Sequence, residues 1–97
     1  MEENKTVKLD LTGCKYVMEM HQRIKKTFHL PEYYGCNWSA FHDMLRGEID
    51  AQCIEIYGEH TLPAQWRDQI EMMHDILFYV KQERSRWGEA FDYIVMD

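Results

Sequence analysis

Residues 30–47 bring aromatic rings and acidic groups together within one turn and one short helix. The segment holds Tyr33, Trp38 and Phe41 close in sequence to the carboxylate of Asp43. Tyrosine and tryptophan contribute much of the binding energy at protein interfaces, and a carboxylate among such rings can enter a cationic pocket on a partner. The chemistry that this segment predicts is therefore recognition of another protein.

Catalytic chemistry finds less support in the same residues. Cys36 and His42 are close enough in sequence to suggest a thiol with its base, and Asp43 is adjacent, but no recognised nucleophile signature surrounds them. We keep an enzyme built around this pair as a third hypothesis. The other histidines are most simply solvated or packed residues, and the five glycines are dispersed as turn residues instead of forming a phosphate-binding loop. The sequence predicts no enzyme, no cofactor and no metal site.

The net charge of −6 indicates which partners to expect. Residues 31–97 hold 13 of the 17 acidic side chains and only 5 of the 11 basic ones. Binding to nucleic acid depends mainly on lysine and arginine neutralising phosphates, so no direct nucleic-acid ligand is expected. The acidic part of the chain favours a basic protein partner.

Length and composition bound the architecture. A chain of 97 residues that is 45% apolar is expected to form one domain over residues 1–97, which folds without a metal or a disulfide. Cys14, Cys36 and Cys53 are odd in number and never spaced as Cys-x-x-Cys, which favours reduced thiols. No secretion signal and no apolar stretch approaching about 20 residues is found. A cytoplasmic protein without a membrane span is predicted.

Hydrophobic periodicity predicts the elements that position the segment. Alternating or β-branched runs predict strands at residues 6–11, 53–57 and 91–96. Spacings of three and four predict helices at residues 16–27, 38–46 and 66–80. This order implies right-handed crossovers and therefore the α/β class, with a small three-stranded, mostly parallel sheet and helices packed on it. The last strand is the most apolar, so it is expected to lie deepest.

Local signals refine the helices. Pro31 and Gly35 bound a structured loop in which Gly35 permits a turn conformation, Asn37 is the expected N-cap, and Gly47 ends the second helix. Its buried stripe is expected to contain Trp38, Phe41, Met44 and Leu45, and its outer side to carry Ser39, His42, Asp43 and Arg46. Tyr33 is expected to be at least partly exposed. In the last helix, the buried stripe is expected to include Met72, Ile76 and Tyr79 in addition to Trp66, Ile70, Met73, Leu77 and Val80.

Residues 20–47 resemble the barstar family, which comprises intracellular inhibitors of secreted microbial ribonucleases. The resemblance begins with residues 20–26 and is most specific in the string Leu-Pro-Glu-Tyr-Tyr-Gly at residues 30–35. It continues through Asn37, Ala40, Asp43, Leu45 and Gly47. The remainder of the chain agrees in length, order of elements and the terminal apolar strand.

This resemblance implies a fold and a function. It implies a three-stranded parallel sheet, with the loop and the second helix inserted into the ribonuclease active site. Tyr33 and Asp43 match the contact tyrosine and the inhibitory aspartate of the family. The carboxylate of Asp43 would mimic a substrate phosphate and bind the arginine, lysine and histidine side chains with which the enzyme holds that phosphate. The partner-binding residues expected on this basis are Tyr33, Gly35, Asn37, Ser39, His42, Asp43 and Arg46.

Three positions depart from the family pattern and imply an altered partner. Ser39 stands where the prototype has an acidic contact, His42 replaces a tryptophan, and Arg46 replaces a small hydroxyl residue. A further acidic contact of the family lies on the last helix, where either Gln82 or Glu83 could occupy it. The leading expectation is an inhibitor of a basic ribonuclease or related toxin, and the alternative is a non-catalytic interaction module on the same scaffold with a non-nuclease partner.

Overall fold

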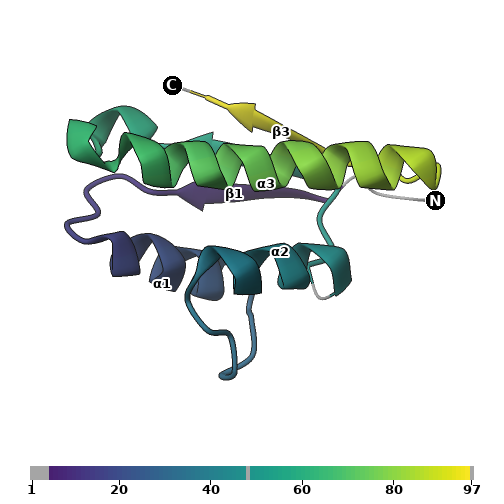
Figure 1. Cartoon of the computed structure of the whole chain (residues 1–97), viewed down its shortest axis with the longest axis horizontal. Helices are drawn as coiled ribbons and strands as arrows, with labels where there is room; N and C mark the ends of the chain where they lie inside the picture. Colours follow the sequence, from purple (N-terminus) through teal and green to yellow (C-terminus); the bar gives the residue numbers. More distant parts are fainter. Residues whose placement is uncertain (1–4, 48, 97) are drawn as a thin grey trace.

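The computed structural model describes residues 5–47 and 49–96, which form a three-stranded parallel sheet with helices packed on it (Figure 1). The predicted α/β fold is therefore confirmed. In chain order the described elements are β1 (Thr6–Asp10), α1 (Val17–Thr27), α2 (Trp38–Gly47), β2 (Cys53–Tyr57), the short 3₁₀ turns η1 (Glu59–Thr61) and η2 (Ala64–Trp66), α3 (Arg67–Arg86) and β3 (Asp92–Val95).

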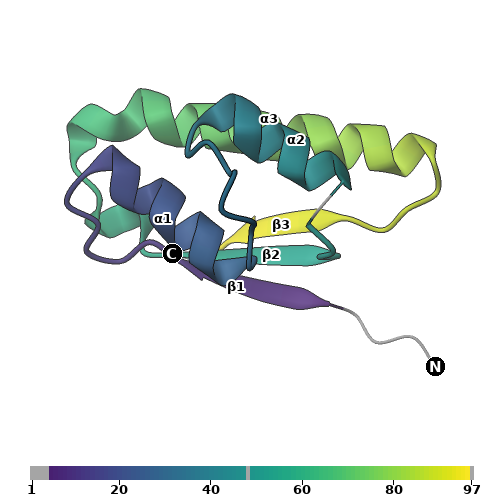
Figure 2. The same ribbon diagram turned by 90° about the horizontal axis from the view of Figure 1, so that it is seen from below.

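The strands lie in the order β1-β2-β3, and the helices α1, α2 and α3 lie on one side of them (Figure 2). The central strand β2 buries Ile54 and Ile56 completely. The expectation that the last strand lies deepest is wrong, because β3 forms an edge and exposes Ile94 and Val95. In the parallel register Ile94 lies beside Glu55, on the face opposite Ile54 and Ile56. Depth in this sheet follows strand position and helix cover, and not the apolar content of the strand.

The core joins the helix-facing side of the sheet to one stripe of each helix. α1 buries Met20 and Ile24, and α3 buries Met73, Leu77 and Val80, as the periodicity predicts. The buried stripe of α3 is narrower than expected: Met72 and Tyr79 are exposed instead of packed. A helix that packs on the rest of the molecule along one stripe leaves the flanking positions in water even where they are apolar.

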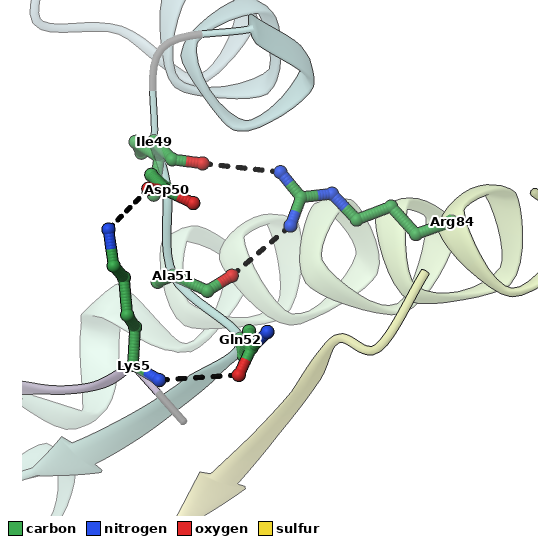
Figure 3. Close-up of polar contacts among 6 residues, drawn as sticks. All are labelled: Lys5, Ile49, Asp50, Ala51, Gln52 and Arg84. Atoms are coloured by element: carbon green, nitrogen blue, oxygen red, sulfur yellow. Dashed lines mark hydrogen bonds and ion pairs between the residues drawn. The ribbon is translucent and has the colours of Figure 1, made fainter. Parts of the chain in front are cut away.

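Arg84 of α3 holds the connection between α2 and β2. Its guanidinium donates hydrogen bonds to the backbone carbonyls of Ala51 (3.1 Å), Ile49 (3.2 Å) and Leu45 (2.7 Å), the last of these within α2. Figure 3 shows the side chain reaching from α3 to this connection, on which Asp50 also pairs with Lys5. The C-terminal turn of α2 is thus fixed to α3 by a charged side chain that packs over the ring of Phe91.

Candidate partner-binding site

The loop between α1 and α2 extends beyond both helices, away from α3 and β3 (Figure 1). Its two adjacent tyrosines have opposite environments. Tyr34 is buried, and its hydroxyl forms a hydrogen bond with His21 Nδ1 at 3.0 Å, which ties the loop to α1. Tyr33 is 71% exposed, as expected from its place after Pro31. The loop therefore has one ring as an anchor and the other available for contact.

Burial changes the proton affinities of the anchoring pair. It lowers the pKa of His21 and raises the pKa of Tyr34, so both side chains stay neutral near pH 7. The centroid of the His21 ring also lies 4.2 Å from that of Trp38, the first residue of α2. A single buried histidine thus contacts both the loop and the helix that follows it.

Gly35 has a different role from the one expected. The left-handed backbone conformations in this loop belong to His29 (φ 54°) and Cys36 (φ 51°), and not to Gly35. Space is what limits position 35, because a Cβ added there would lie 3.0 Å from Asn37 Nδ2. That nitrogen donates to the carbonyl of Gly35 at 3.1 Å, so a side chain would press on the hydrogen bond that shapes the turn.

Asn37 is the N-cap of α2, as predicted. Its Oδ1 accepts a hydrogen bond from the backbone N–H of Ala40 at 2.8 Å, and its carbonyl accepts the first helical bond from Phe41. The same side chain thus closes the turn through Gly35 and begins the helix. This double role fixes the direction in which α2 leaves the loop.

The buried side of α2 contains the four residues expected there, with Phe41 and Leu45 fully enclosed. Trp38 is also buried, and its indole N–H donates to Gln69 Oε1 of α3 at 2.8 Å. Together with the His21 contact, this bond links α1, α2 and α3 beneath the loop. The sequence did not predict the hydrogen bond to Gln69, because nothing in the local pattern around a polar helix residue indicates a partner 31 residues away.

The outer side of α2 exposes Ser39, Asp43 and Arg46. Over residues 5–47 and 49–96, Asp43 has no hydrogen bond or ion pair. Its carboxylate is therefore not sequestered by the described side chains and faces solvent on the same segment as Tyr33.

His42 was expected on the outer side of α2, but it is half-buried because its ring packs against Tyr79 of α3. Its ring packs edge-on against the ring of Tyr79, with 5.3 Å between the ring centroids. Its Nε2 is buried and has no hydrogen-bond partner among the described residues. No hydrogen bond joins His42 to Cys36 within the described ranges. Tyr79 was expected in the core, but it is exposed on α3, where its ring contacts His42 of α2. Its spacing of four from both Asp75 and Glu83 is the sequence signal that could have placed it at the surface.

Arg46 contacts α3 through an ion pair with Glu83 at 3.3 Å. Of the two residues considered for an acidic contact on the last helix, Glu83 is thus engaged within the protein, and Gln82 is exposed. Glu83 thus offsets the positive charge of Arg46, whereas the carboxylate of Asp43 is unpaired among the described residues.

The three cysteines are free thiols and differ in burial. Cys14 is buried, Cys36 and Cys53 are half-buried, and all are free thiols, as expected. Within the described ranges, no three histidine, cysteine or acidic side chains lie close enough together to hold a metal ion. Among the same residues, no helix has the length and apolar character needed to cross a membrane.

A sequence model of the family described as barstar (barnase inhibitor) matches residues 4–95. The chain belongs to the barstar family. The match includes every described strand and helix, so it extends well beyond residues 20–47, where the resemblance is most specific. Barstar proteins are ribonuclease inhibitors and, in general, not enzymes. The residues that the sequence predicts to contact a partner lie in the loop and on α2, and we refer to them as the candidate partner-binding site: Tyr33, Gly35, Asn37, Ser39, His42, Asp43 and Arg46.

Proposed function

We propose that this protein inhibits a basic microbial ribonuclease or related toxin by inserting the loop and α2 into its active site. The observation that carries the proposal is the exposed carboxylate of Asp43, which is unpaired among the described residues. A ribonuclease binds the scissile phosphate with cationic side chains. A carboxylate held rigidly on a helix can replace that phosphate without offering a bond to cleave.

Each remaining site residue has a role in this proposal. The exposed ring of Tyr33 contacts the rim of the ribonuclease cleft, where a tyrosine contributes area at low entropic cost. Gly35 and Asn37 set the geometry of the loop. Ser39, His42 and Arg46 adjust which ribonuclease is recognised, because they replace the acidic, aromatic and hydroxyl contacts of the prototype.

Charge supports a protein partner over a nucleic acid. The net charge of −6 repels a phosphate backbone and attracts a basic protein. We place the inhibitor in the cytoplasm of the producing cell, where its free cysteines suit a reducing environment.

The proposal is tested by measuring inhibition of barnase and of a panel of basic secreted microbial ribonucleases. For any enzyme that is inhibited, Asp43→Ala is expected to weaken binding by about 2–5 kcal/mol, because the cations facing the carboxylate lose their partner. The prototype complex of the family is itself a reference case for multi-kcal/mol losses of this kind, with values that reach beyond this range. The thermal midpoint of the free variant is expected to change little, since Asp43 is exposed.

The matched control is Asp68→Ala, which removes another exposed carboxylate, from the first turn of α3. It is expected to alter binding by less than about 1 kcal/mol. Equal affinities of the Asp43→Ala and Asp68→Ala variants for an inhibited ribonuclease would contradict the assignment of Asp43.

A second candidate function is binding to a partner that is not a nuclease. The specific observation in its favour concerns Arg46, which stands where the prototype has a small hydroxyl side chain and forms an ion pair with Glu83 of α3. Tight binding of a secreted protein without inhibition of ribonuclease activity would support this alternative over the first.

A further inference from the structure

The two edges of the sheet differ in how they are protected against further pairing. The outer edge of β1 carries the exposed side chains of Lys8 and Asp10, and Arg23 of α1 donates to the backbone carbonyl of Asp10 at 2.8 Å. Charged side chains on an edge strand hinder the addition of another strand. The opposite edge, at the margin of the molecule in Figure 1, instead exposes three apolar side chains by 38–46%: Ile94, Val95 and Met96.

The backbone of β3 directs two residues away from the sheet. The N–H groups of Asp92 and Met96 donate to carbonyls in or directly before β2. Because successive residues of a strand direct their polar groups to opposite sides, Tyr93 and Val95 direct theirs to the open edge. The N–H of Tyr93 donates to Asp92 Oδ1 at 2.8 Å. Neither backbone polar group of Val95 has a partner among the described residues, so this position can accept a further strand.

The charge beside this edge is balanced within the chain. The carboxylate of Asp92, the first residue of β3, accepts a hydrogen bond from Lys81 Nζ of α3 at 2.9 Å. Phe78 lies one turn before Lys81 and is 55% exposed, so α3 presents a further apolar side chain on the side of β3. The β3 edge is thus apolar and locally neutral, although the whole chain is acidic.

We propose that two copies of this protein associate through their β3 strands, which pair antiparallel around a two-fold axis at Ile94. Tyr93 of each copy then lies opposite Val95 of the other, and the two residues exchange backbone hydrogen bonds. Both polar groups of each Val95 gain a partner in this way. The N–H of Tyr93 exchanges its hydrogen bond to Asp92 for one to the second copy.

The same register brings compatible side chains together across the two-fold axis. Ile94 faces its own counterpart, Tyr93 packs beside Val95, and like charges do not meet, because Asp92 lies opposite Met96. A second copy therefore fits this edge better than a basic peptide does. A basic peptide would find apolar side chains here and a carboxylate that is already paired within its own chain.

The dimer is expected to be weak, because each copy contributes one short strand. Interfaces that bury less than about 1,200 Å² are typical of transient complexes, and we expect a dissociation constant on the order of 0.1 mM. Each copy carries a net charge of −6, so added salt should strengthen the association by screening the repulsion between copies.

The dimer leaves the candidate partner-binding site of each copy accessible. The loop between α1 and α2 extends away from β3, so the paired strands and the two loops lie on different sides of the molecule (Figure 1). The inference goes beyond the proposed function and does not depend on it. If both are correct, one dimer binds two ribonuclease molecules.

The first test is sedimentation equilibrium of the full chain from about 5 µM to about 1 mM, at about 50 and 500 mM NaCl. The average mass should rise from 11.8 kDa towards twice this value, at lower protein concentration in the higher salt. The amide NMR signals of residues 93–95 should shift over the same concentration range. A chain that stays monomeric at the highest concentration in both salts would overturn the inference.

Two pairs of variants test the pairing itself. Val95→Pro removes the outward N–H at a position where the sheet loses no hydrogen bond, and it should weaken dimerisation about tenfold or more. Val95→Thr keeps the N–H and a β-branched side chain, and it should dimerise like the parent protein. Ile94→Lys places two ammonium groups opposite each other and should abolish the dimer. The control Thr6→Lys adds the same charge to the β1 edge and should leave dimerisation unchanged.

Circular dichroism and urea unfolding establish that each variant is folded, and Ile94→Lys alone decides the question if Val95→Pro does not fold. Equal self-association of Ile94→Lys and Thr6→Lys would refute the pairing, as would concentration-dependent shifts confined to residues outside β3. If the chain stays monomeric but Val95→Pro weakens binding to a ribonuclease that it inhibits, the edge pairs with the ribonuclease, and the inference is wrong. A failure of dimerisation leaves inhibition by the monomer unaffected, so the two proposals fail separately.

Discussion

Replacing Arg84 with methionine tests whether the connection between α2 and β2 depends on one charged side chain. The guanidinium donates three hydrogen bonds, to the carbonyls of Leu45, Ile49 and Ala51, and these residues are at most 3% exposed. Because water cannot reach such carbonyls easily, they would lose their charged donor without replacement. Each buried acceptor left unpaired costs about 1–3 kcal/mol.

Methionine keeps an apolar stem but removes the guanidinium, whose central carbon lies 4.8 Å from the centroid of the Phe91 ring and whose Nε lies 3.8 Å from Glu89 Oε1. The Glu89 carboxylate is 63% exposed, so the loss of this ion pair adds little to the loss of the three hydrogen bonds. Partial relaxation of the connection would recover some hydrogen bonding. We therefore expect Arg84→Met to lower the free energy of unfolding by about 3–5 kcal/mol. Against a typical total of about 5–15 kcal/mol, this is a large fraction of the stability.

Arg84→Lys is expected to recover only a minor part of this loss, since one ammonium on a flexible stem cannot span three carbonyls. The matched control is Arg86→Met, an exposed position in the same last turn of α3 with the same relation to the helix dipole. It should change the stability by less than about 0.5 kcal/mol.

The assay is urea unfolding followed by circular dichroism and tryptophan fluorescence. The dependence of the unfolding free energy on urea concentration should stay unchanged between the variants. If Arg84→Met lost no more than about 1 kcal/mol beyond Arg86→Met, the three hydrogen bonds would not hold the connection as reasoned here.

Three further outcomes follow from polar groups in the interior. Burial lowers the pKa of His21 below its ordinary 6.5, so the folded protein binds fewer protons at this site than the unfolded chain. The free energy of unfolding should therefore fall as the pH drops through about 6.5. A His21→Phe variant that keeps this pH dependence would contradict the assignment to His21. The pKa of His74 shifts in the opposite direction, because the hydrogen bond between its Nε2 and Glu59 at 2.6 Å raises it. The pair should stabilise the fold by up to about 1 kcal/mol at pH 5.5 and lose this contribution as the pH rises through the pKa of the folded state. Urea unfolding of the His74→Gln variant at pH 5.5 and 8.5 measures this difference. Gln69→Leu should cost about 1 kcal/mol because the indole N–H of Trp38 loses its acceptor, whereas Gln69→Glu keeps one; equal stability of the two variants would exclude this bond as a contributor.

The sequence predicted the local part of the site well. The spacing of Trp38, Phe41 and Leu45 predicted the buried side of α2, and Asn37 predicted where the helix begins. The exposure of Tyr33 followed from its position after Pro31. These features depend on interactions within a few residues, so they are encoded locally and can be recognised without knowing the rest of the fold.

The sequence by itself therefore determined the elements of the α/β fold, the family, and which side of α2 faces outward. Only the tertiary structure decided that β3 lies at an edge, that Tyr79 is exposed against His42, and that Arg46 pairs with Glu83. Periodicity reports that a residue could be buried, but burial itself requires another element to cover that position. Segments far apart in the chain provide this cover, and their placement is set by packing of the whole molecule and not by any local pattern.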